Sequence, residues 1–323
     1  MTPRRQLALV LALCCATSGF ALAQQKYPVK PVRLVLPFTA GSAVDVLGRL
    51  YAQHLSETWG QQVLVDNRAG ANGIIGMEFI AHALPDGYTI GMGNVATLAI
   101  NPSLYPRLTY DPQRDYAPVS YVAAITNCLI VHPSLPARSV SELVALAKSR
   151  PGQLNYASGG VGSAQHIPME VLKSLTGINI VHVAYKGLTP AFNDVLAGQV
   201  PMMTSSVANA LPHHKTGRLR ILGTMGAKRT TATPEIPTIA EAVPGFEGDS
   251  WAGLIAPAGT PADIITRIQT EAVRVGNLPD VRERLTTLGF EVTGTPPAVL
   301  AELIRKDSAR LGNVIRSAGI RAE

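Results

Sequence analysis

Three turns rich in small polar residues are the places where this sequence could do chemistry. They cover residues 37–45, 91–97 and 158–166, and are called here the first, second and third turns. Each follows a short apolar run and precedes an amphipathic one, so each is expected to join a strand to a helix. The start of a helix presents unpaired N–H groups and a partial positive charge, glycine lets the backbone approach an anion, and Ser and Thr add hydroxyl donors. Such turns can bind a carboxylate without a Lys or Arg.

The same residues also suit ordinary strand-to-helix turns in which Ser and Thr only cap helices. Three single residues share this ambiguity. Asp45 either stabilises a helix N-terminus or receives an ammonium group or a bridging water. His166 either packs and caps the helix that follows the third turn or hydrogen-bonds a ligand. Lys186 either lies in a solvated turn or attracts an anion at the mouth of a cleft.

Other kinds of site find little support. The sequence contains no Gly-x-Ser-x-Gly elbow, no His-Glu-x-x-His pair and no Gly-Lys-Ser/Thr phosphate loop. Gly91, Gly93 and Ala96 match a dinucleotide fingerprint in spacing, but they lie outside the first strand–helix unit and lack an acidic partner. His213 and His214 are adjacent, so on a helix they point apart and cannot share a metal. We therefore expect no catalytic residues, no metal and no cofactor.

Composition and charge narrow the class of protein. The 323 residues include 28 basic and 22 acidic side chains, a formal net charge of +6, and no Lys/Arg block of five or more. A nucleic-acid partner would favour a denser basic patch, so we expect none. The chain is long enough for about two domains.

The first residues resemble an export signal. Arg4 and Arg5 precede the apolar run 7–16, and Ala21-Leu22-Ala23 fits the small-x-small cleavage pattern. Residues 1–23 are therefore predicted to be a cleaved signal peptide, which places the protein in the periplasm. Lipoprotein processing at Cys14 or Cys15 is disfavoured, because neither cysteine follows a small residue. Cys128 would then be the sole cysteine of the mature chain and is expected to be a buried small hydrophobe.

Short apolar runs alternate with helical patterns through most of the chain, which predicts an α/β fold with parallel sheets covered by helices. Strands are expected over residues 32–37, 63–66, 88–92, 119–125, 128–132, 155–158, 178–185, 199–204 and 219–224. Helices are expected over 44–59, 74–84, 163–175 and 189–196, and the C-terminal part is predicted to be mostly helical. In the last helix a stripe of Leu300, Ile304, Leu311 and Ile315 should pack on the first domain.

Two Pro-rich polar segments, residues 105–118 and 228–246, frame the centre of the chain. They predict a discontinuous first domain, residues 27–124 plus 226–323, and a continuous second domain, residues 125–225. A single large sheet is the alternative.

Seven short motifs in the sequence resemble those of a known protein family. They are Pro37-Phe38-x-x-Gly41 with Asp45, Asp66-Asn67-Arg68-x-Gly70-x-x-Gly73, Pro85-Asp86-Gly87-Tyr88-Thr89, Asn101-Pro102-Ser103-Leu104-Tyr105, Pro151-Gly152-x-Leu154-Asn155-Tyr156-Ala157-Ser158, Tyr185-Lys186-Gly187 and Ala256-Pro257-Ala258-Gly259-Thr260-Pro261. Each is weak alone, but their order and spacing are specific. From Tyr27 to about Ile320 the chain resembles the Bug family, the extracytoplasmic substrate-binding components of tripartite tricarboxylate transporters.

The resemblance implies a two-domain Venus-flytrap of the type II periplasmic binding-protein kind, each domain a mostly parallel sheet flanked by helices. It implies a monomeric, non-enzymatic protein that captures an organic acid, an aromatic acid or an acidic amino acid. That carboxylate would pass to one large and one small integral membrane subunit. By position, the ligand-binding residues would be Phe38, Gly41, Ser42, Asp45, Asn94, Thr97, Ser158, Gly162, Ser163, His166, Ser205 and Ser206.

Two departures from the family pattern bear on the ligand. The first turn has Gly41-Ser42 where Gly-Gly is usual, and Ser205-Ser206 stand where many members carry Asp-Asn. Loss of an acid from the cleft lip favours a more anionic ligand, or one less apt to carry an ammonium group. A secreted enzyme acting on small acids and a binding protein that signals to a membrane sensor remain the alternatives.

Overall fold

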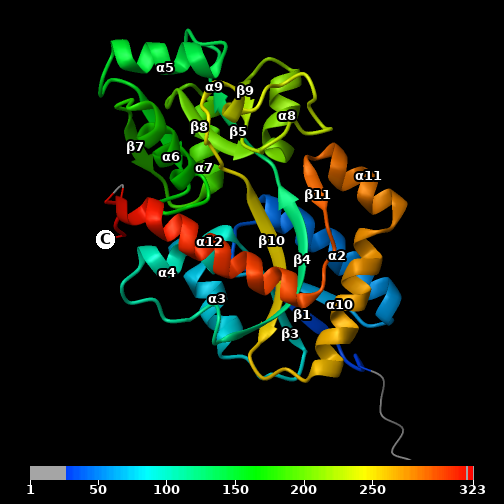
Figure 1. The fold of residues 1–323 in the computed structure, drawn as a ribbon. Coiled ribbons are helices and arrows are strands. Elements are labelled where there is room, and N and C mark those ends of the chain that lie inside the picture. The colour runs from blue at the N-terminus through cyan, green and yellow to red at the C-terminus, as the bar shows by residue number, and fades with distance from the viewer. Residues whose placement is uncertain (1–26, 318, 323) are drawn as a thin grey trace, which may run out of the picture.

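The computed structural model describes residues 27–317 and 319–322, so the predicted signal peptide lies outside the described residues. The chain forms two lobes, each built on one sheet with helices around it (Figure 1). Strands β4 and β10 lie side by side along the first lobe and lead toward the second. None of the described helices is both long and apolar enough to cross a membrane.

The first lobe contains a six-stranded sheet in the order β11-β4-β10-β3-β1-β2. Its strands are β1 (Val32–Leu36), β2 (Val63–Asn67), β3 (Thr89–Asn94), β4 (Tyr116–Ile125), β10 (Ser250–Pro257) and β11 (Phe290–Val292). Strand β1 pairs in parallel with β2 and β3, whereas β10 is antiparallel to both β3 and β4, and β11 is antiparallel to β4.

The second lobe contains a five-stranded sheet in the order β7-β6-β8-β5-β9. Its strands are β5 (Asn127–Val131), β6 (Asn155–Ser158), β7 (Val181–Ala184), β8 (Met202–Ser206) and β9 (Arg220–Thr224). Strand β6 is parallel to β7 and β8, and β5 is antiparallel to β8 and β9. Both sheets are mixed, so the prediction of mostly parallel sheets is wrong in this detail. The chain leaves the first lobe along β4, enters β5 of the second lobe after Thr126 alone, and returns to the first lobe along β10. Because β4 leads out of the first lobe and β10 leads back into it, the two strands are antiparallel.

Helices cover both sheets. Those of the first lobe are α2 (Ala43–Trp59), η1 (Ala71–Gly73), α3 (Ile74–Ala81), η2 (Ala96–Ile100), α4 (Asn101–Leu104), α10 (Ala262–Gly276), α11 (Pro279–Thr287) and α12 (Pro297–Ser317). Those of the second lobe are α5 (Val140–Ser149), α6 (His166–Thr176), α7 (Leu188–Leu196), α8 (Val207–Lys215) and α9 (Ile239–Ala242). The expected alternation of strand and helix is therefore present, with α6 beginning three residues later than expected.

The second passage between the lobes comes later in the chain than residue 226. Ile239, Val243 and Phe246 are buried with Leu129 and Tyr156 in the core of the second sheet. The segment 226–246 therefore packs with the second lobe, whereas the sequence boundary assigned it to the first. Within this Pro-rich polar segment these three apolar residues are spaced by four and three, and Ile239 at the start of α9, Val243 at its C-cap and Phe246 beyond it all pack into that core.

The third hydrophobic cluster joins the two lobes. It combines Leu104 and Trp251 of the first lobe with Ile167 at the start of α6. The predicted α12 stripe of Leu300, Ile304, Leu311 and Ile315 is buried in this same cluster, which confirms its packing on the first lobe. The lobes are thus in apolar contact on the α6 side, and the shape of the space between them depends on that contact.

Candidate ligand-binding cleft

A cavity of about 630 Å³ lies between the two lobes. The first lobe contributes the first turn, the loop 69–73, Asn94 and Tyr105, and the strand junctions contribute Ile125, Asn127 and Ser250. The second lobe contributes residues 159–161, 163–165 and 185–188 together with Ser206. Both lobes therefore provide walls, and a molecule held here would contact both.

The first turn presents the start of a long helix to this cavity. Ser42 is the N-cap of α2, and its Oγ accepts a hydrogen bond from the Asp45 N–H at 3.2 Å. Ala43 and Val44 line the cavity directly after this cap. Gly41 has φ of +81°, in the left-handed region that glycine tolerates, and a Cβ there would meet nothing within 4 Å. The 17-residue α2 thus directs its positive end at the cavity.

Asp45 is buried behind the first turn and does not line the cavity. Its carboxylate accepts hydrogen bonds from Gly41 N at 2.9 Å, Arg49 Nε at 3.0 Å and Asn67 Nδ2 at 2.8 Å. Burial by itself would raise the pKa of Asp45, but the hydrogen bonds from Arg49, Gly41 and Asn67 bring that pKa below its ordinary value. Asp45 holds the turn in shape.

In the second turn a single amide faces the cavity. Asn94 Oδ1 accepts from the N–H groups of Ala96 at 3.0 Å and Thr97 at 3.2 Å, which fixes the orientation of the amide. Asn94 lines the cavity, and its Nδ2 donates to none of the described protein groups. Thr97 is fully buried, and its hydroxyl bonds back to the Asn94 main chain. The turn therefore presents one neutral N–H donor whose position is fixed.

The third turn lines the cavity with residues 159–161 and 163–165, which include Ser163, while Ser158 lies behind it. The Ser158 hydroxyl bonds the main chain of Gly160 at 3.0 Å and lies 2.6 Å from His182 Nε2. Ser163 Oγ accepts from the His166 N–H at 3.2 Å. Gly162 has φ of +73°, and its carbonyl accepts from Asn72 Nδ2 of the first lobe at 3.2 Å.

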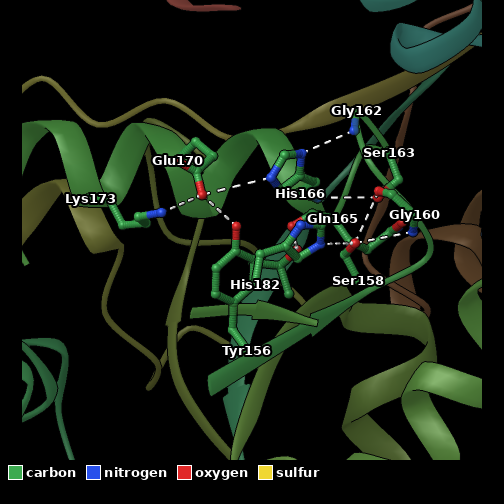
Figure 2. Close-up of polar contacts among 11 residues, drawn as sticks. Tyr156, Ser158, Gly160, Gly162, Ser163, Gln165, His166, Glu170, Lys173 and His182 are labelled. Carbon is green, nitrogen blue, oxygen red and sulfur yellow. Dashed lines mark hydrogen bonds and ion pairs between the residues drawn. The ribbon is translucent and has the colours of Figure 1, made fainter. Parts of the chain in front are cut away.

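His166 belongs to a stacked network beneath the third turn (Figure 2). Its Nδ1 accepts from the Gly162 N–H at 2.9 Å, and its ring stacks on His182 with centroids 4.0 Å apart. Glu170 Oε1 lies 3.7 Å from His166 Nε2 and accepts from Tyr156 Oη at 2.5 Å and Lys173 Nζ at 2.7 Å. An imidazole that accepts through Nδ1 and faces a carboxylate through Nε2 is held as the Nε2–H tautomer.

Two pKa values in this network are displaced. Burial, with the neighbouring His166, lowers the pKa of His182 to about 4. Burial opposes ionisation of Glu170, but hydrogen bonds from His166, Lys173 and Tyr156 lower its pKa to about 2. At neutral pH the network therefore combines a neutral His182 with an ionised Glu170.

The two serines that end β8 differ in position. Ser206 lines the cavity and is the N-cap of α8, accepting from the Asn209 N–H at 3.3 Å. Ser205 is fully buried within the sheet, and its hydroxyl finds no partner among the described residues. Ser250, at the start of β10, also belongs to the lining, and its buried hydroxyl finds no partner among the described residues.

The charged side chains among the described residues that line the cavity are all basic. Among the described residues that line it, Lys186 and Arg321 are the charged ones, and no carboxylate is present. The N-terminal ends of α2, α7 and α8 meet the same space through Ser42, Leu188 and Ser206. Two cations, several helix N-termini and neutral donors favour an anionic occupant.

The structure separates the twelve predicted site residues into two groups. Five line the cavity: Phe38, Ser42, Asn94, Ser163 and Ser206. Seven do not, and most of these support the lining turns from behind: Gly41, Asp45, Thr97, Ser158, Gly162, His166 and Ser205. Lining residues that the sequence analysis missed include the loop 69–73, Tyr105, Asn127, Ser250 and Arg321. The motif containing Gly70 and Gly73 could have indicated the loop, since Gly70 has φ of +130° and Gly73 of +86°.

No group of three or more His, Cys, Asp or Glu side chains in the described part of the chain is arranged to hold a metal ion. Cys128 is fully buried, and burial with the nearby Asp249 raises its pKa, which suits the small hydrophobe expected from the sequence.

Proteins of similar sequence match nearly the whole length of this chain. A family model described as "Tripartite tricarboxylate transporter family receptor" matches residues 47–320. The chain is 38% identical over 315 residues to the UPF0065 protein in the tcbD-tcbE intergenic region of Pseudomonas sp. strain P51, covering 97% of this chain and 94% of that one. It is 33% identical over 318 residues to protein BugT of Bordetella pertussis, covering 97% and 98%.

Solved structures agree with the sequence comparison. An R. palustris protein solved with adipate superposes with a TM-score of 0.88 at 36% identity, covering 91% of this chain and 99% of that one. Periplasmic binding protein BugD superposes with a TM-score of 0.86 at 30% identity, covering 92% and 100%. MatC of Rhodopseudomonas palustris, with bound malate, gives 0.84 at 32% identity, covering 90% and 100%.

These matches agree with the cleft between two α/β lobes and with the absence of a catalytic motif in the sequence. The fold is that of periplasmic binding proteins, and the matched family and structures are solute-binding proteins, not enzymes. The chain belongs to the tripartite tricarboxylate transporter receptor family, the family of the Bug solute-binding proteins.

Proposed function

We propose that this protein captures a small dicarboxylate in the cleft between its lobes and delivers it to a tripartite membrane transporter. The observation that carries the proposal is the lining of the cavity, in which Lys186 and Arg321 are the charged residues and the rest is neutral or apolar. Two similar proteins are solved with dicarboxylates, adipate and malate, which supports the choice of ligand class.

The first and second turns, together with Ser163 and Ser206, would bind one carboxylate. Backbone N–H groups at the start of α2, the Asn94 amide and the Ser163 and Ser206 hydroxyls all belong to the lining. A hydrogen bond to a charged group contributes about 1.5–3 kcal/mol, so three or four approach the roughly 8 kcal/mol of micromolar binding before the costs of association. The residues behind these turns fix the donors in place and act as positioning residues.

Binding would favour the arrangement in which both lobes contact the ligand. Turns one and two belong to the first lobe, and turn three and Ser206 to the second, so a ligand touching all of them stabilises the closed form over an open one. The ligand would be released when the lobes separate at the transporter. We propose that the membrane partners are one large and one small subunit, and that the protein works as a monomer in the periplasm after cleavage of residues 1–23. A role in signalling would use the same cleft.

A thermal-shift screen tests the ligand class. The protein would be unfolded and refolded to remove any carried ligand, then heated with dicarboxylates, tricarboxylates, aromatic acids and acidic amino acids. A ligand that binds only the folded state raises the melting temperature with concentration. We expect dicarboxylates to give the largest shift. A shift with none of these acids would overturn the proposal.

Asn94→Asp provides the sharpest test of the site itself. Asp retains an oxygen that accepts from Ala96 and Thr97, but it replaces the N–H donor facing the cavity with a second carboxylate oxygen. Loss of a donor combined with like-charge repulsion should weaken dicarboxylate binding about 100-fold or more, with little change in melting temperature. Calorimetric titration measures the affinity. Unchanged affinity in this variant would mean that the carboxylate binds elsewhere.

A further inference from the structure

The C-terminal tail crosses back to the cavity after the last helix. Gly319 has φ of +65°, the Gly319 N–H bonds Arg316 O at 3.2 Å, and the Ile320 N–H bonds Ile315 O at 3.0 Å. This is the hydrogen-bond pattern of a helix closed by a left-handed glycine, which reverses the chain. The red end of α12 in Figure 1 lies where the first lobe meets the second. The reversal at Gly319 therefore directs residues 320–322 toward the cleft.

Two apolar residues anchor this tail. Ile320 and Ala322 are half-buried against the cluster that joins the lobes, the same cluster that holds the α12 stripe. Arg321 lies between them and lines the cavity, while remaining exposed. Ala322 lines the cavity as well. Packing of Ile320 and Ala322 on the cluster thus holds this part of the tail, with Arg321, at the edge of the cavity.

Arg321 faces a space to which the described residues contribute no acidic side chain. Neither Arg321 nor Lys186 forms an ion pair with a described carboxylate, and no described acidic side chain lines the cavity. Lys186 belongs to the second lobe, whereas the tail carrying Arg321 is anchored largely on first-lobe elements. An anionic group held between them would therefore be paired with a cation from each side of the cleft.

We infer that Arg321 is a specificity-determining residue, which selects ligands carrying a second carboxylate and pairs with that carboxylate together with Lys186. The inference rests on the proposed function, because the first carboxylate must be held by the donors of the first and second turns. The guanidinium offers a planar fork of donors that matches a carboxylate in two parallel hydrogen bonds. The tail thus extends a carboxylate site into a dicarboxylate site.

The test compares two ligands of equal chain length, adipate and hexanoate, on the full-length mature protein by calorimetric titration. Arg321→Gln removes the charge and leaves both apolar anchors in place. It should weaken adipate binding about tenfold and hexanoate binding by less than about threefold, with the melting temperature unchanged. Arg316→Gln, five residues earlier on α12 and outside the cavity lining, is the matched control and should leave both affinities unchanged.

Arg321→Lys should recover part of the adipate affinity, because the charge returns without the two-pronged geometry. Equal losses for adipate and hexanoate, or an unchanged adipate affinity in Arg321→Gln, would overturn the inference and leave the proposed function standing. Wild-type protein that binds hexanoate as tightly as adipate would also overturn it. Wild-type protein that binds neither these two acids nor any other carboxylate would remove the proposed function as well.

Discussion

The first and third turns line opposite sides of the cleft. Both are glycine-containing strand-to-helix turns, but a carboxylate supports the first turn from behind and two imidazoles support the third. Behind the first turn, the Asp45 carboxylate accepts hydrogen bonds from Gly41, Arg49 and Asn67, and despite burial these bonds lower its pKa, so it stays ionised across the neutral range. Behind the third, the support comes from two stacked imidazoles, His166 on Gly162 and His182 on Ser158. One turn is therefore fixed independently of pH near neutrality, and the other holds its shape while His182 is neutral.

The two turns also differ in what lies against them. Gly41 stands in open space, whereas Gly162 is packed on Leu104 of the first lobe and bonded to Asn72 there. The third turn thus belongs to the contact between lobes as well as to the cleft. The difference indicates that the first turn serves as a rigid platform and that the third couples ligand contacts to the position of the second lobe.

Replacing the two glycines should give the largest contrast. A Cβ on Gly162 would lie 1.7 Å from Leu104 Cδ2, while a Cβ on Gly41 would meet nothing within 4 Å. Both residues have positive φ, so each Ala substitution costs about 1–2 kcal/mol of backbone strain, and Gly162→Ala adds about 1–3 kcal/mol of overpacking. We expect Gly162→Ala to weaken dicarboxylate binding about 100-fold and Gly41→Ala about tenfold or less.

Calorimetric titration of both variants checks this contrast. Adding Leu104→Ala to Gly162→Ala should restore part of the affinity by making room for the new methyl group. Equal losses at the two positions would contradict the assignment of the third turn to the contact between lobes.

Removing the carboxylate behind the first turn should have the next largest effect. Asp45→Ala removes the acceptor of the Gly41 N–H and of Arg49 Nε, while Asn67 Nδ2 retains its bond to Phe38 O. Unfolding in urea should show a loss of about 2–3 kcal/mol. Asp263→Ala provides a matched control, because Asp263 is an exposed acid in the first turn of α10 and should contribute about 0.5 kcal/mol through the helix dipole alone. Similar losses for the two variants would mean that Asp45 acts only on the dipole.

The smallest effect is a pH dependence from the third turn. His182 has a pKa of about 4 when folded, below its ordinary value of 6.5, so the unfolded chain takes up a proton first as the pH falls. The contribution of His182 to the free energy of unfolding is therefore lost as the pH falls from about 6.5 to about 4. As the pH falls from about 7.5 to about 5, the free energy of unfolding of His182→Asn should therefore rise relative to that of the wild type. A difference that stays constant over this range would contradict the account.

Asp249 acts with the opposite sign, which is why the comparison must be made between variants. Burial, with the nearby Glu291 and Glu247, raises the pKa of Asp249 to about 7, so its contribution to stability is lost as the pH rises from about 4 to about 7. Asp249→Asn should therefore gain more stability at about pH 7.5 than at about pH 5 in the same urea experiments. In the wild-type protein alone the two contributions partly cancel, so its free energy of unfolding changes less with pH than either group would make it change.

Local patterns predicted most of the fold. The helix 44–59 and the strands 63–66 and 155–158 are found within a residue of their expected bounds. Strand β10 was missed, although all eight of its residues are buried. A strand buried on both faces has no alternating pattern, and this one stands among helices in the sequence. Its antiparallel pairing with β3 and β4 depends on the return of the chain from the second lobe.

The site was predicted at the level of turns and less well at the level of side chains. Composition located the three turns, but it could not tell Ser163, which faces the cavity, from Ser158, which faces His182. Both are serines beside glycines, and only the backbone path decides which way each points. Arg321 lies more than 130 residues from any of the three turns, so no local pattern connects it with them. Its place follows from the chain reversal at Gly319.

Calorimetric titration of refolded, ligand-free wild-type protein with adipate and with its uncharged diamide tests the central claim most directly. The two molecules share length and shape and differ in charge. The account predicts binding of adipate in the micromolar range, weakened by added salt, and binding of the diamide at least about 100-fold weaker. Equal affinity for the two molecules would contradict it, because a cleft lined with cations, helix N-termini and a fixed amide donor must distinguish an anion from its neutral analogue.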